Sequence, residues 1–287
     1  MNIFVLMKQV PGTSNVKMDE KTGTMIRTEH ENVINPLDEN ALEEALRIRR
    51  AVSGSTVTAI SMGPPPAAKA LREALAMGAD SAVLLCHRAL AGSDTLATAR
   101  ALASGIKHVA GGDVGPRDII LCGERATDGE TGQVGPMVAA LLDVCVATYV
   151  RSIRLEGVGS AGSEKGAESA DSGGGACAAA VVERVVEDGF EQVKLSLPCM
   201  ITVVKDINHP GFPTLAGKIR ARGAEVLTLD HEQLALDSDA VGLSGSPTRV
   251  VQIFRPSFAR NTVLHAQDGS GAAVDAFLDL LADRGLM

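Results

Sequence analysis

The sequence predicts an α/β fold: a Rossmann-like, doubly wound and mainly parallel sheet with helices on both faces, plus a hairpin and an extended C-terminal arm. Two observations carry this prediction. Short apolar runs alternate with amphipathic helical segments through the first half of the chain, which is the pattern of a parallel sheet covered on both faces. A glycine-rich turn also follows one of these runs and leads into a helix, as at the ligand-binding edge of doubly wound folds.

Five short apolar runs in the first half predict buried strands, at residues 3–7, 56–62, 82–86, 119–122 and 144–150. The segments between them have apolar residues at helical spacing, at residues 38–52, 67–77, 95–109 and 136–142. Asn35, Pro36 and Asp38 signal the start of the first helix, and Ser93 with Asp94 forms a capping signal before the third.

The second half of the chain is less regular. Residues 156–180 are rich in Gly, Ser and Ala, which predicts a loosely held insertion at the tip of a hairpin. Strand-like runs follow at residues 181–186, 192–197 and 200–204, and an extended segment at 248–254 precedes a short amphipathic helix at 272–281. We therefore divide the chain into a nucleotide-binding α/β domain, residues 1–222, and a C-terminal arm, residues 223–287.

Composition excludes several classes of partner. The formal net charge is −8, so neither nucleic acid nor an anionic membrane is expected to bind. No apolar stretch reaches the ~18 residues of a membrane span, and the first residues read as a strand rather than a signal peptide. The five cysteines lack C-x-x-C spacing and the six histidines are scattered, so we predict reduced thiols, no metal site and a cytoplasmic location.

The most informative motif is the turn after the fourth apolar run, where residues 123–136 read GERATDGETGQVGP. Backbone N–H groups of such a turn and of the following helix start lack partners, and the helix dipole favours negative charge there. Gly129, Gly132 and Gly135 permit a ligand to approach the backbone closely. The turn therefore predicts a bound nucleotide or dinucleotide.

Two further loops are expected at the same edge, because the carboxyl ends of parallel strands lie together. They are residues 8–13, after the first strand, and residues 62–66, after the second. With the glycine-rich turn they are expected to line one crevice.

Several side chains near this crevice have two interpretations. Asp128 and Glu130 are either a catalytic carboxylate pair or turn residues that bond local N–H groups or a ribose, and we favour the second. The helix start at Asp94 is either a cap or a second nucleotide-binding element. Arg125 either neutralises a phosphate or a reduced flavin, or is a solvated turn residue. No residue stands in a recognisable nucleophile motif, so we expect a bound cofactor to supply the chemistry and assign no catalytic residue.

Five longer segments are more specific than any single glycine pattern. They read MKQVP at residues 7–11, NPLDENALEEAL at 35–46, MGPP at 62–65, AMGAD at 76–80 and DGETGQVGP at 128–136. On these segments the chain, from Met1 to about Leu281, resembles the beta subunit of electron transfer flavoproteins.

The resemblance implies a heterodimer with an alpha subunit that carries an FAD, and an adenine nucleotide in the crevice of this chain. In ordinary members the nucleotide is a structural AMP. In electron-bifurcating members, and in the similar FixA-type proteins, it is an FAD that accepts a hydride from NADH. The segments AGSDTLAT at residues 91–98, MGPP at 62–65, QVGP at 133–136 and GSPT at 245–248 resemble the second kind, so FAD is expected, with AMP as the alternative.

The implied function sends one electron through the alpha-subunit FAD to an acyl-CoA dehydrogenase or quinone reductase, and the other to ferredoxin or flavodoxin. Only the heterodimer would oxidise NADH. Leu215 stands where the family places a hydrophobic partner-docking residue. A non-redox nucleotide-binding sensor of the same fold is the remaining alternative. The cofactor contacts that the resemblance and the turn imply are Leu6, Met7, Lys8, Asn35, Asp38, Met62, Asp94, Thr95, Thr98, Gly123, Arg125, Asp128, Gly129, Glu130, Thr131, Gly132, Gln133 and Val134.

Overall fold

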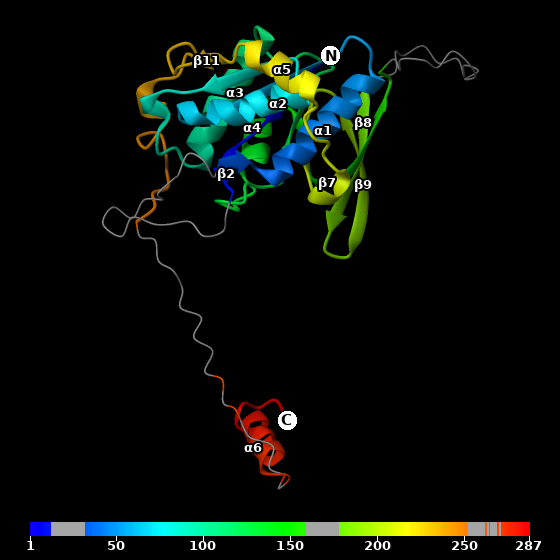
Figure 1. Ribbon diagram of the computed structural model, residues 1–287, viewed down its shortest axis with the longest axis vertical. Coiled ribbons are helices and arrows are strands. Elements are labelled where there is room, and N and C mark those ends of the chain that lie inside the picture. Colours follow the sequence, from blue (N-terminus) through cyan, green and yellow to red (C-terminus); the bar gives the residue numbers. More distant parts are fainter. Residues whose placement is uncertain (13–31, 159–177, 252–261, 263, 265–268, 270) are drawn as a thin grey trace, which may run out of the picture. The chain divides into compact units, whose positions relative to one another are not determined.

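A computed structural model describes residues 1–12, 32–158, 178–251, 262, 264, 269 and 271–287 (Figure 1). The chain divides into two compact units, Met1–Val250 and Val251–Met287. The first unit contains the sheet and the helices that cover it. The second contains the helix α6 (Ala272–Asp283), which confirms the helix expected at residues 272–281. Packing of residues 223–287 on an alpha subunit stays a prediction.

A nine-stranded sheet forms the centre of the first unit (Figure 1). Its strands are β1 (Asn2–Leu6), β4 (Thr56–Met62), β5 (Ser81–Leu85), β6 (Ile119–Gly123), β7 (Cys145–Glu156), β8 (Ala179–Val186), β9 (Gly189–Ser196), β10 (Cys199–Val203) and β11 (Leu227–Leu229). They lie in the order β11-β5-β4-β1-β6-β10-β7-β8-β9. β7, β8 and β9 pair antiparallel, and all other neighbours pair parallel. The predicted mainly parallel sheet with a hairpin is confirmed.

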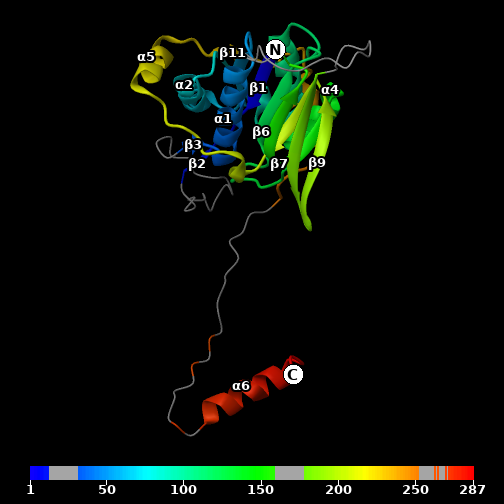
Figure 2. The same cartoon turned by 90° about the vertical axis from the view of Figure 1, so that its right-hand side faces the viewer.

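Helices cover both faces of this sheet, as expected of a doubly wound fold. α1 (Pro36–Ala51), α2 (Ala68–Met77) and α5 (Leu215–Gly223) contribute buried residues to one hydrophobic core. α3 (Thr95–Ala110) and α4 (Val134–Leu142) contribute to the other. Figure 2 shows α1 and α2 on one side of the central strands and α4 on the opposite side.

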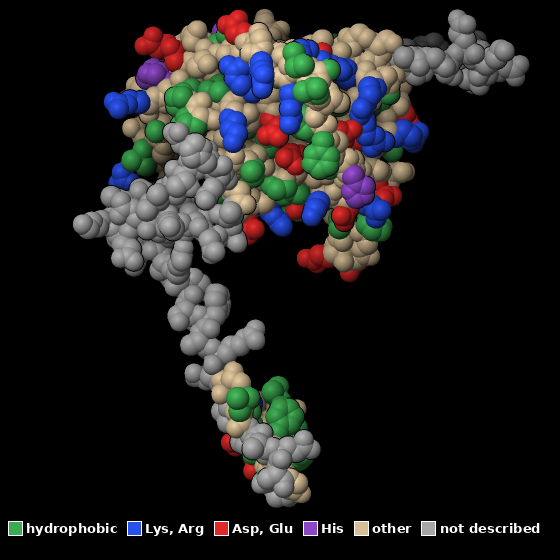
Figure 3. Space-filling model, in the orientation of Figure 1, with side chains coloured by type: hydrophobic (Ala, Val, Ile, Leu, Met, Phe, Trp, Pro, Cys, Tyr) green, Lys and Arg blue, Asp and Glu red, His purple; other side chains and the backbone are tan. Residues whose placement is uncertain are grey.

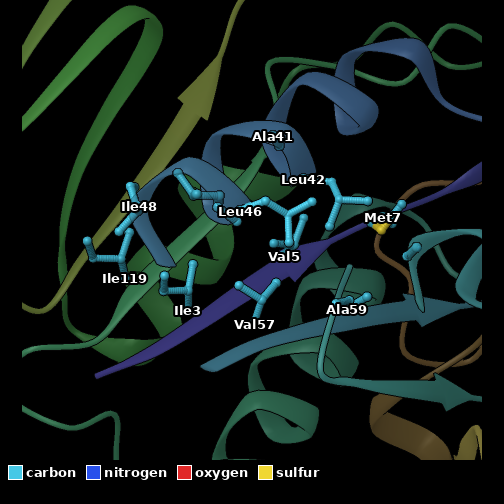
Figure 4. Packing of buried hydrophobic residues seen from close by; sticks show 14 of the residues in the cluster. Ile3, Val5, Met7, Ala41, Leu42, Leu46, Ile48, Val57, Ala59 and Ile119 are labelled. Carbon is cyan, nitrogen blue, oxygen red and sulfur yellow. The ribbon is translucent and has the colours of Figure 1, made fainter. Parts of the chain in front are cut away.

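β1 is buried on both faces, which explains its continuous run of apolar residues. Ile3 and Val5 pack under Leu42 and Leu46 of α1 (Figure 4). Phe4 points the other way, into the core beneath α3 and α4. Burying side chains of this size stabilises a fold by about 1.5–3 kcal/mol each, so β1 is firmly held at the centre of the sheet, where the first of the site loops leaves it.

Several element ends differ from the sequence prediction. α1 begins at Pro36 rather than at residue 38, because proline suits the first helical position. α4 begins at Val134 rather than at Pro136, because proline is tolerated anywhere in the first helical turn, where its missing N–H has no helical partner. β7 continues to Glu156 and pairs with β8, so the expected hairpin is present. Residues 159–177 of the predicted insertion lie outside the described residues.

Among the described residues, three strands and one α-helix were not predicted. β2 (Gln9–Pro11) and β3 (Asn32–Ile34) form a separate antiparallel pair. β11 adds a parallel edge strand beside β5, and α5 covers α2. Of the extended segment expected at residues 248–254, only the part up to Val251 lies within the described residues.

Candidate functional site

A cavity of about 1060 Å³ opens at the carboxyl ends of β1, β4, β5 and β6. This volume lies just above the ~300–1,000 Å³ usual for ligand pockets. The chain winds from β1 through β4 to β5 in one direction, and then returns to place β6 on the other side of β1. Ligands of doubly wound folds bind at such a reversal, and the cavity lies there.

The three loops that were expected to meet do line this cavity. Lys8 follows β1, Gly63 follows β4, and the glycine-rich turn follows β6. Most of the predicted contacts are among the lining residues, namely Leu6, Met7, Lys8, Asp38, Met62, Asp94, Thr95, Thr98, Gly123, Arg125, Gly129, Glu130, Thr131, Gly132, Gln133 and Val134.

Two predicted contacts, Asn35 and Asp128, do not line the cavity but hold the glycine-rich turn in place. The Asn35 amide donates to the carbonyl of Arg125 at 2.9 Å and accepts the N–H of Thr127 at 3.2 Å. The Asp128 carboxylate lies 2.7 Å from the ammonium of Lys8. The turn is therefore tied to the start of α1 and to the loop after β1.

Asp38 joins the two halves of the sheet at the reversal. It stands in the first turn of α1, where its Oδ2 accepts the N–H of Lys8 at 2.8 Å and its Oδ1 accepts the N–H of Gly123 at 2.9 Å. Burial raises the pKa of Asp38 to about 7, although the hydrogen bonds from Gly123 and Lys8 oppose that rise. This carboxyl group therefore titrates near neutral pH.

The glycine-rich turn presents backbone donors without partners. The N–H groups of Thr131, Gly132 and Gln133 make no hydrogen bond to any described residue. Gly132 has a φ of 62° and Glu130 a φ of 50°, a left-handed conformation that is uncommon outside glycine and favours outward-pointing amides. Gln133 is the N-cap residue of α4 and makes no side-chain cap. These residues fit the phosphate-binding turn that the sequence predicts.

The start of α3 also lines the cavity. Asp94 caps this helix, because its Oδ1 accepts the N–H groups of Leu96 and Ala97, each at 3.0 Å. Its Oδ2 accepts the N–H and the hydroxyl of Thr248, at 3.0 and 2.8 Å. Burial opposes ionisation, but the hydrogen bonds from Ala97, Thr248 and Leu96 lower the pKa of Asp94. Asp94 is thus a cap and also part of the cavity lining.

A side-chain contact links the two helix starts. The hydroxyl of Thr95 donates to the side-chain oxygen of Gln133 at 3.0 Å. Gln133 stands before α4 and Thr95 opens α3. The side-chain amide of Gln133, which was expected to contact the cofactor, is therefore held by α3.

The charges around the cavity are mixed. The guanidinium of Arg125 lies 3.5 Å from the carboxylate of Glu124. Burial raises the pKa of Glu124, and the charge of Arg125 opposes this rise. Arg88 also lines the cavity and makes no ion pair with another described residue. Its free guanidinium suits a phosphate.

Sequence reasoning missed part of the lining. His87, Arg88 and Leu90 follow β5, which ends on the same edge as the other parallel strands. The rule that gathered the three loops applies equally to this fourth loop, so its residues were predictable. Val250 also lines the cavity, and no local pattern in the sequence indicates that.

Leu215 lies away from the cavity, at the start of α5. Its side chain is 77% exposed, and Phe212 and Ile219 beside it are 96% and 62% exposed. Figure 3 shows hydrophobic side chains interspersed with basic ones on the face that carries α2 and α5. The surface at the start of α5 is therefore apolar and is surrounded by basic side chains.

Two structural findings concern other classes of site. Within the described ranges, no cluster of three or more His, Cys, Asp or Glu side chains is arranged to hold a metal ion. None of the helices in the described part of the chain is long and apolar enough to cross a membrane.

The fold and the edge that carries the cavity are those of nucleotide-binding α/β proteins. Residues 22–234 match the electron transfer flavoprotein domain, and the chain belongs to this family. It is 45% identical to the electron transfer flavoprotein subunit beta of Thermoanaerobacterium thermosaccharolyticum, over 91% of this chain and 90% of the relative.

Two other relatives have different names. The chain is 42% identical to the caffeyl-CoA reductase–Etf complex subunit CarD of Acetobacterium woodii, over 89% of this chain and 88% of that protein. It is 38% identical to protein FixA of Azotobacter vinelandii, over 89% of this chain and 84% of that protein. The resemblance to beta subunits and FixA-type proteins is therefore confirmed along most of the chain.

Proposed function

We propose that the cavity of this beta-type subunit holds FAD, that the subunit takes a hydride from NADH, and that the two electrons then part. One goes through the FAD of an alpha subunit to an acyl-CoA dehydrogenase or quinone reductase, and the other goes to ferredoxin or flavodoxin. FAD supplies the redox chemistry when bound, because it accepts electrons in pairs and releases them singly. The chain's own residues bind and orient it.

The extent of the cavity carries this proposal. It reaches from the glycine-rich turn to the start of α3 and the loop after β5, with a volume of about 1060 Å³. AMP has one phosphate and no flavin, so it would occupy the turn and leave the wall formed by Asp94, Thr95 and Thr98 without a ligand. A dinucleotide fills both sides.

The residues divide the work. The unpartnered N–H groups of residues 131–133 bind the pyrophosphate, at a helix start that favours anions. Asp38 and the Lys8–Asp128 ion pair keep that turn at its distance from β1. Arg88 supplies positive charge from the loop after β5. No nucleophile is required, because the residues of the cavity bind and orient the cofactor and the cofactor supplies the chemistry.

The names of the relatives support acyl-CoA chemistry in the partner. One relative is named a subunit of a caffeyl-CoA reductase–Etf complex, and another is an acryloyl-CoA reductase electron transfer subunit from Anaerotignum propionicum. We assign docking of the dehydrogenase to the exposed Leu215 and Phe212. The apolar side chains of α6, including Val274 and Phe277, are exposed and suit packing on the alpha subunit.

The test is the nucleotide content of the heterodimer purified with its alpha subunit. We expect two FAD per heterodimer and no AMP. One FAD with one AMP would overturn the proposal in favour of the ordinary carrier, and a colourless protein with bound ATP or AMP would favour the sensor. Gly132→Ala should remove the beta-site FAD alone. Gly111→Ala is the matched control, since Gly111 has a similar φ of 75° but stands at the end of α3.

A further inference from the structure

Two cysteines face each other across neighbouring strands, at the end of the sheet opposite the cavity. Cys145 is the first residue of β7 and Cys199 the first residue of β10. The two strands pair parallel, and Cys199 is the register partner of Cys145. They therefore lie at the amino ends of their strands, whereas the cavity opens at the carboxyl ends.

Both thiols are on the same face of the sheet. Partners in register on parallel strands point to the same side, and side chains two positions apart on a strand share a face. Ala147 and Ile201, two positions further along each strand, belong with Cys199 to the core beneath α1 and α2. Neighbouring strands lie ~4.7–4.9 Å apart, within the ~4.4–6.8 Å between Cα atoms that a disulfide spans.

The two thiols differ in access. Cys145 is exposed, whereas Cys199 is fully buried. Burial, and then the neighbouring Cys145, raise the pKa of Cys199 to about 12. An accessible thiol reacts first with an oxidant in solution, and a thiol with a high pKa reacts slowly because little of it is thiolate.

We propose that Cys145 and Cys199 are a reversible dithiol–disulfide site, closed by a low-molecular-weight disulfide such as oxidised glutathione. The thiolate of Cys145 attacks one sulfur of the oxidant, whose S–S bond breaks and releases one thiolate. The thiolate of Cys199 then attacks the Cys145 sulfur and expels the second. The two protein thiols lose two electrons to the oxidant, and their two protons pass to the released thiols.

The disulfide would join β7 to β10 and so fix the β7–β9 hairpin to the parallel part of the sheet. Because the cavity lies at the carboxyl ends of the strands and the cysteines at the amino ends, nucleotide binding should not change when the disulfide forms. The resistance of this region to unfolding should rise, since a cross-link restricts the unfolded chain. The inference does not depend on which nucleotide the cavity holds.

Other cysteines are poorer partners for Cys145. Cys122 lies in the core on the opposite face of the sheet, under α3 and α4. Cys86 lines the cavity at the carboxyl end of β5. Cys177 falls outside the described residues, and it is replaced by serine in the experiment so that it cannot compete.

The experiment treats the purified heterodimer carrying Cys177→Ser with oxidised glutathione, then digests it without reductant for mass spectrometry. We expect a peptide that joins Cys145 to Cys199 and separates on reduction. Adding Cys199→Ala should instead leave glutathione on Cys145, and adding Cys145→Ser should leave Cys199 unmodified. Melting curves of each variant before oxidation show that the fold is intact.

A second readout is the rate of closure. It should rise about tenfold per pH unit below the pKa of Cys199, because that thiol must lose its proton to attack. Glutathione on Cys145 with no cross-link at any pH would overturn the proposal. A cross-link from Cys145 to Cys86 or Cys122 would overturn it as well.

Discussion

The carboxylate of Asp38 accepts the backbone N–H of Gly123 at 2.9 Å. Asp38 lies in the first turn of α1, and Gly123 ends β6. Since the same carboxylate accepts the N–H of Lys8 after β1, one buried group spans the reversal of the sheet on which the cavity is built. The stability of the fold and the shape of the site should therefore change together when this group is altered.

Replacing Asp38 by asparagine should destabilise the protein by about 1–3 kcal/mol. The new amide oxygen can accept one of the two N–H groups, but its NH₂ group faces the other, which leaves a buried donor without a partner. Urea unfolding measures the change. Asp113→Asn is the control, because the Asp113 side chain is 91% exposed; an equal loss in both variants would contradict the role given to Asp38.

Stability should also depend on pH through Asp38. Its pKa is raised from 3.8 to about 7 in the folded protein, so the folded state holds the proton more tightly than the unfolded state. The stability that this tighter proton binding contributes is fully present below the unfolded pKa and is lost as the pH rises through about 7. The free energy of unfolding should fall with pH in this window by at most about 1.4 kcal/mol per unit. In the Asp38→Asn variant the free energy of unfolding should no longer fall with pH in this way. The same slope in the variant and in the unaltered protein would show that Asp38 does not cause the pH dependence.

The Lys8–Asp128 pair should act on ligand binding more than on stability. Its Lys8 side chain is 46% exposed, and ion pairs of that exposure contribute at most about 1 kcal/mol to folding. Asp128→Ala and Lys8→Ala should each weaken nucleotide binding about tenfold, by releasing the turn. The double variant should be no weaker than either single one, because both remove the same contact. Additive losses in titration calorimetry would show that the two residues act separately.

Glycines in the same turn should differ in tolerance. A Cβ on Gly123 would lie 2.6 Å from the Cβ of Leu37 and 2.8 Å from its backbone carbon, so Gly123→Ala should cost about 1–3 kcal/mol of stability. A Cβ on Gly129 meets nothing within 4 Å, and Gly129→Ala should leave the melting temperature unchanged. Comparable melting temperatures for the two variants would contradict the packing of α1 against β6.

The regular part of the fold was predictable because buried helices and strands have a recognisable local pattern of apolar residues. The continuous apolar run of residues 3–7 reflects burial of β1 on both faces of the sheet, and Pro36 reflects the geometry of a first helical turn. Asn35 makes no side-chain cap and instead bonds Arg125 and Thr127 of the glycine-rich turn.

β11 left no such local pattern, and the start of α5 is marked only by Thr214, which caps the helix by accepting the N–H of Gly217. β11 is three residues long, and its pairing with β5 is a contact between distant segments. α5 ends in Gly223 and has few buried residues.

The site was predictable where backbone geometry decides it, as in residues 131–133. The site was less predictable where a side chain bonds a residue that is distant in the sequence. Asp128 was expected at a ligand, yet its carboxylate lies against Lys8. Asp94 was expected as a helix cap or a nucleotide-binding element, and its contact to Thr248 was not expected. Such pairings join residues far apart in the chain, which periodicity and turn chemistry do not encode.

The most direct measurement is a crystal structure of the heterodimer grown with excess FAD. We predict FAD in this cavity, with pyrophosphate oxygens hydrogen-bonded to the backbone N–H groups of Thr131, Gly132 and Gln133. A nucleotide bound elsewhere, or a cavity that stays empty in excess FAD, would contradict the proposed role of the cavity.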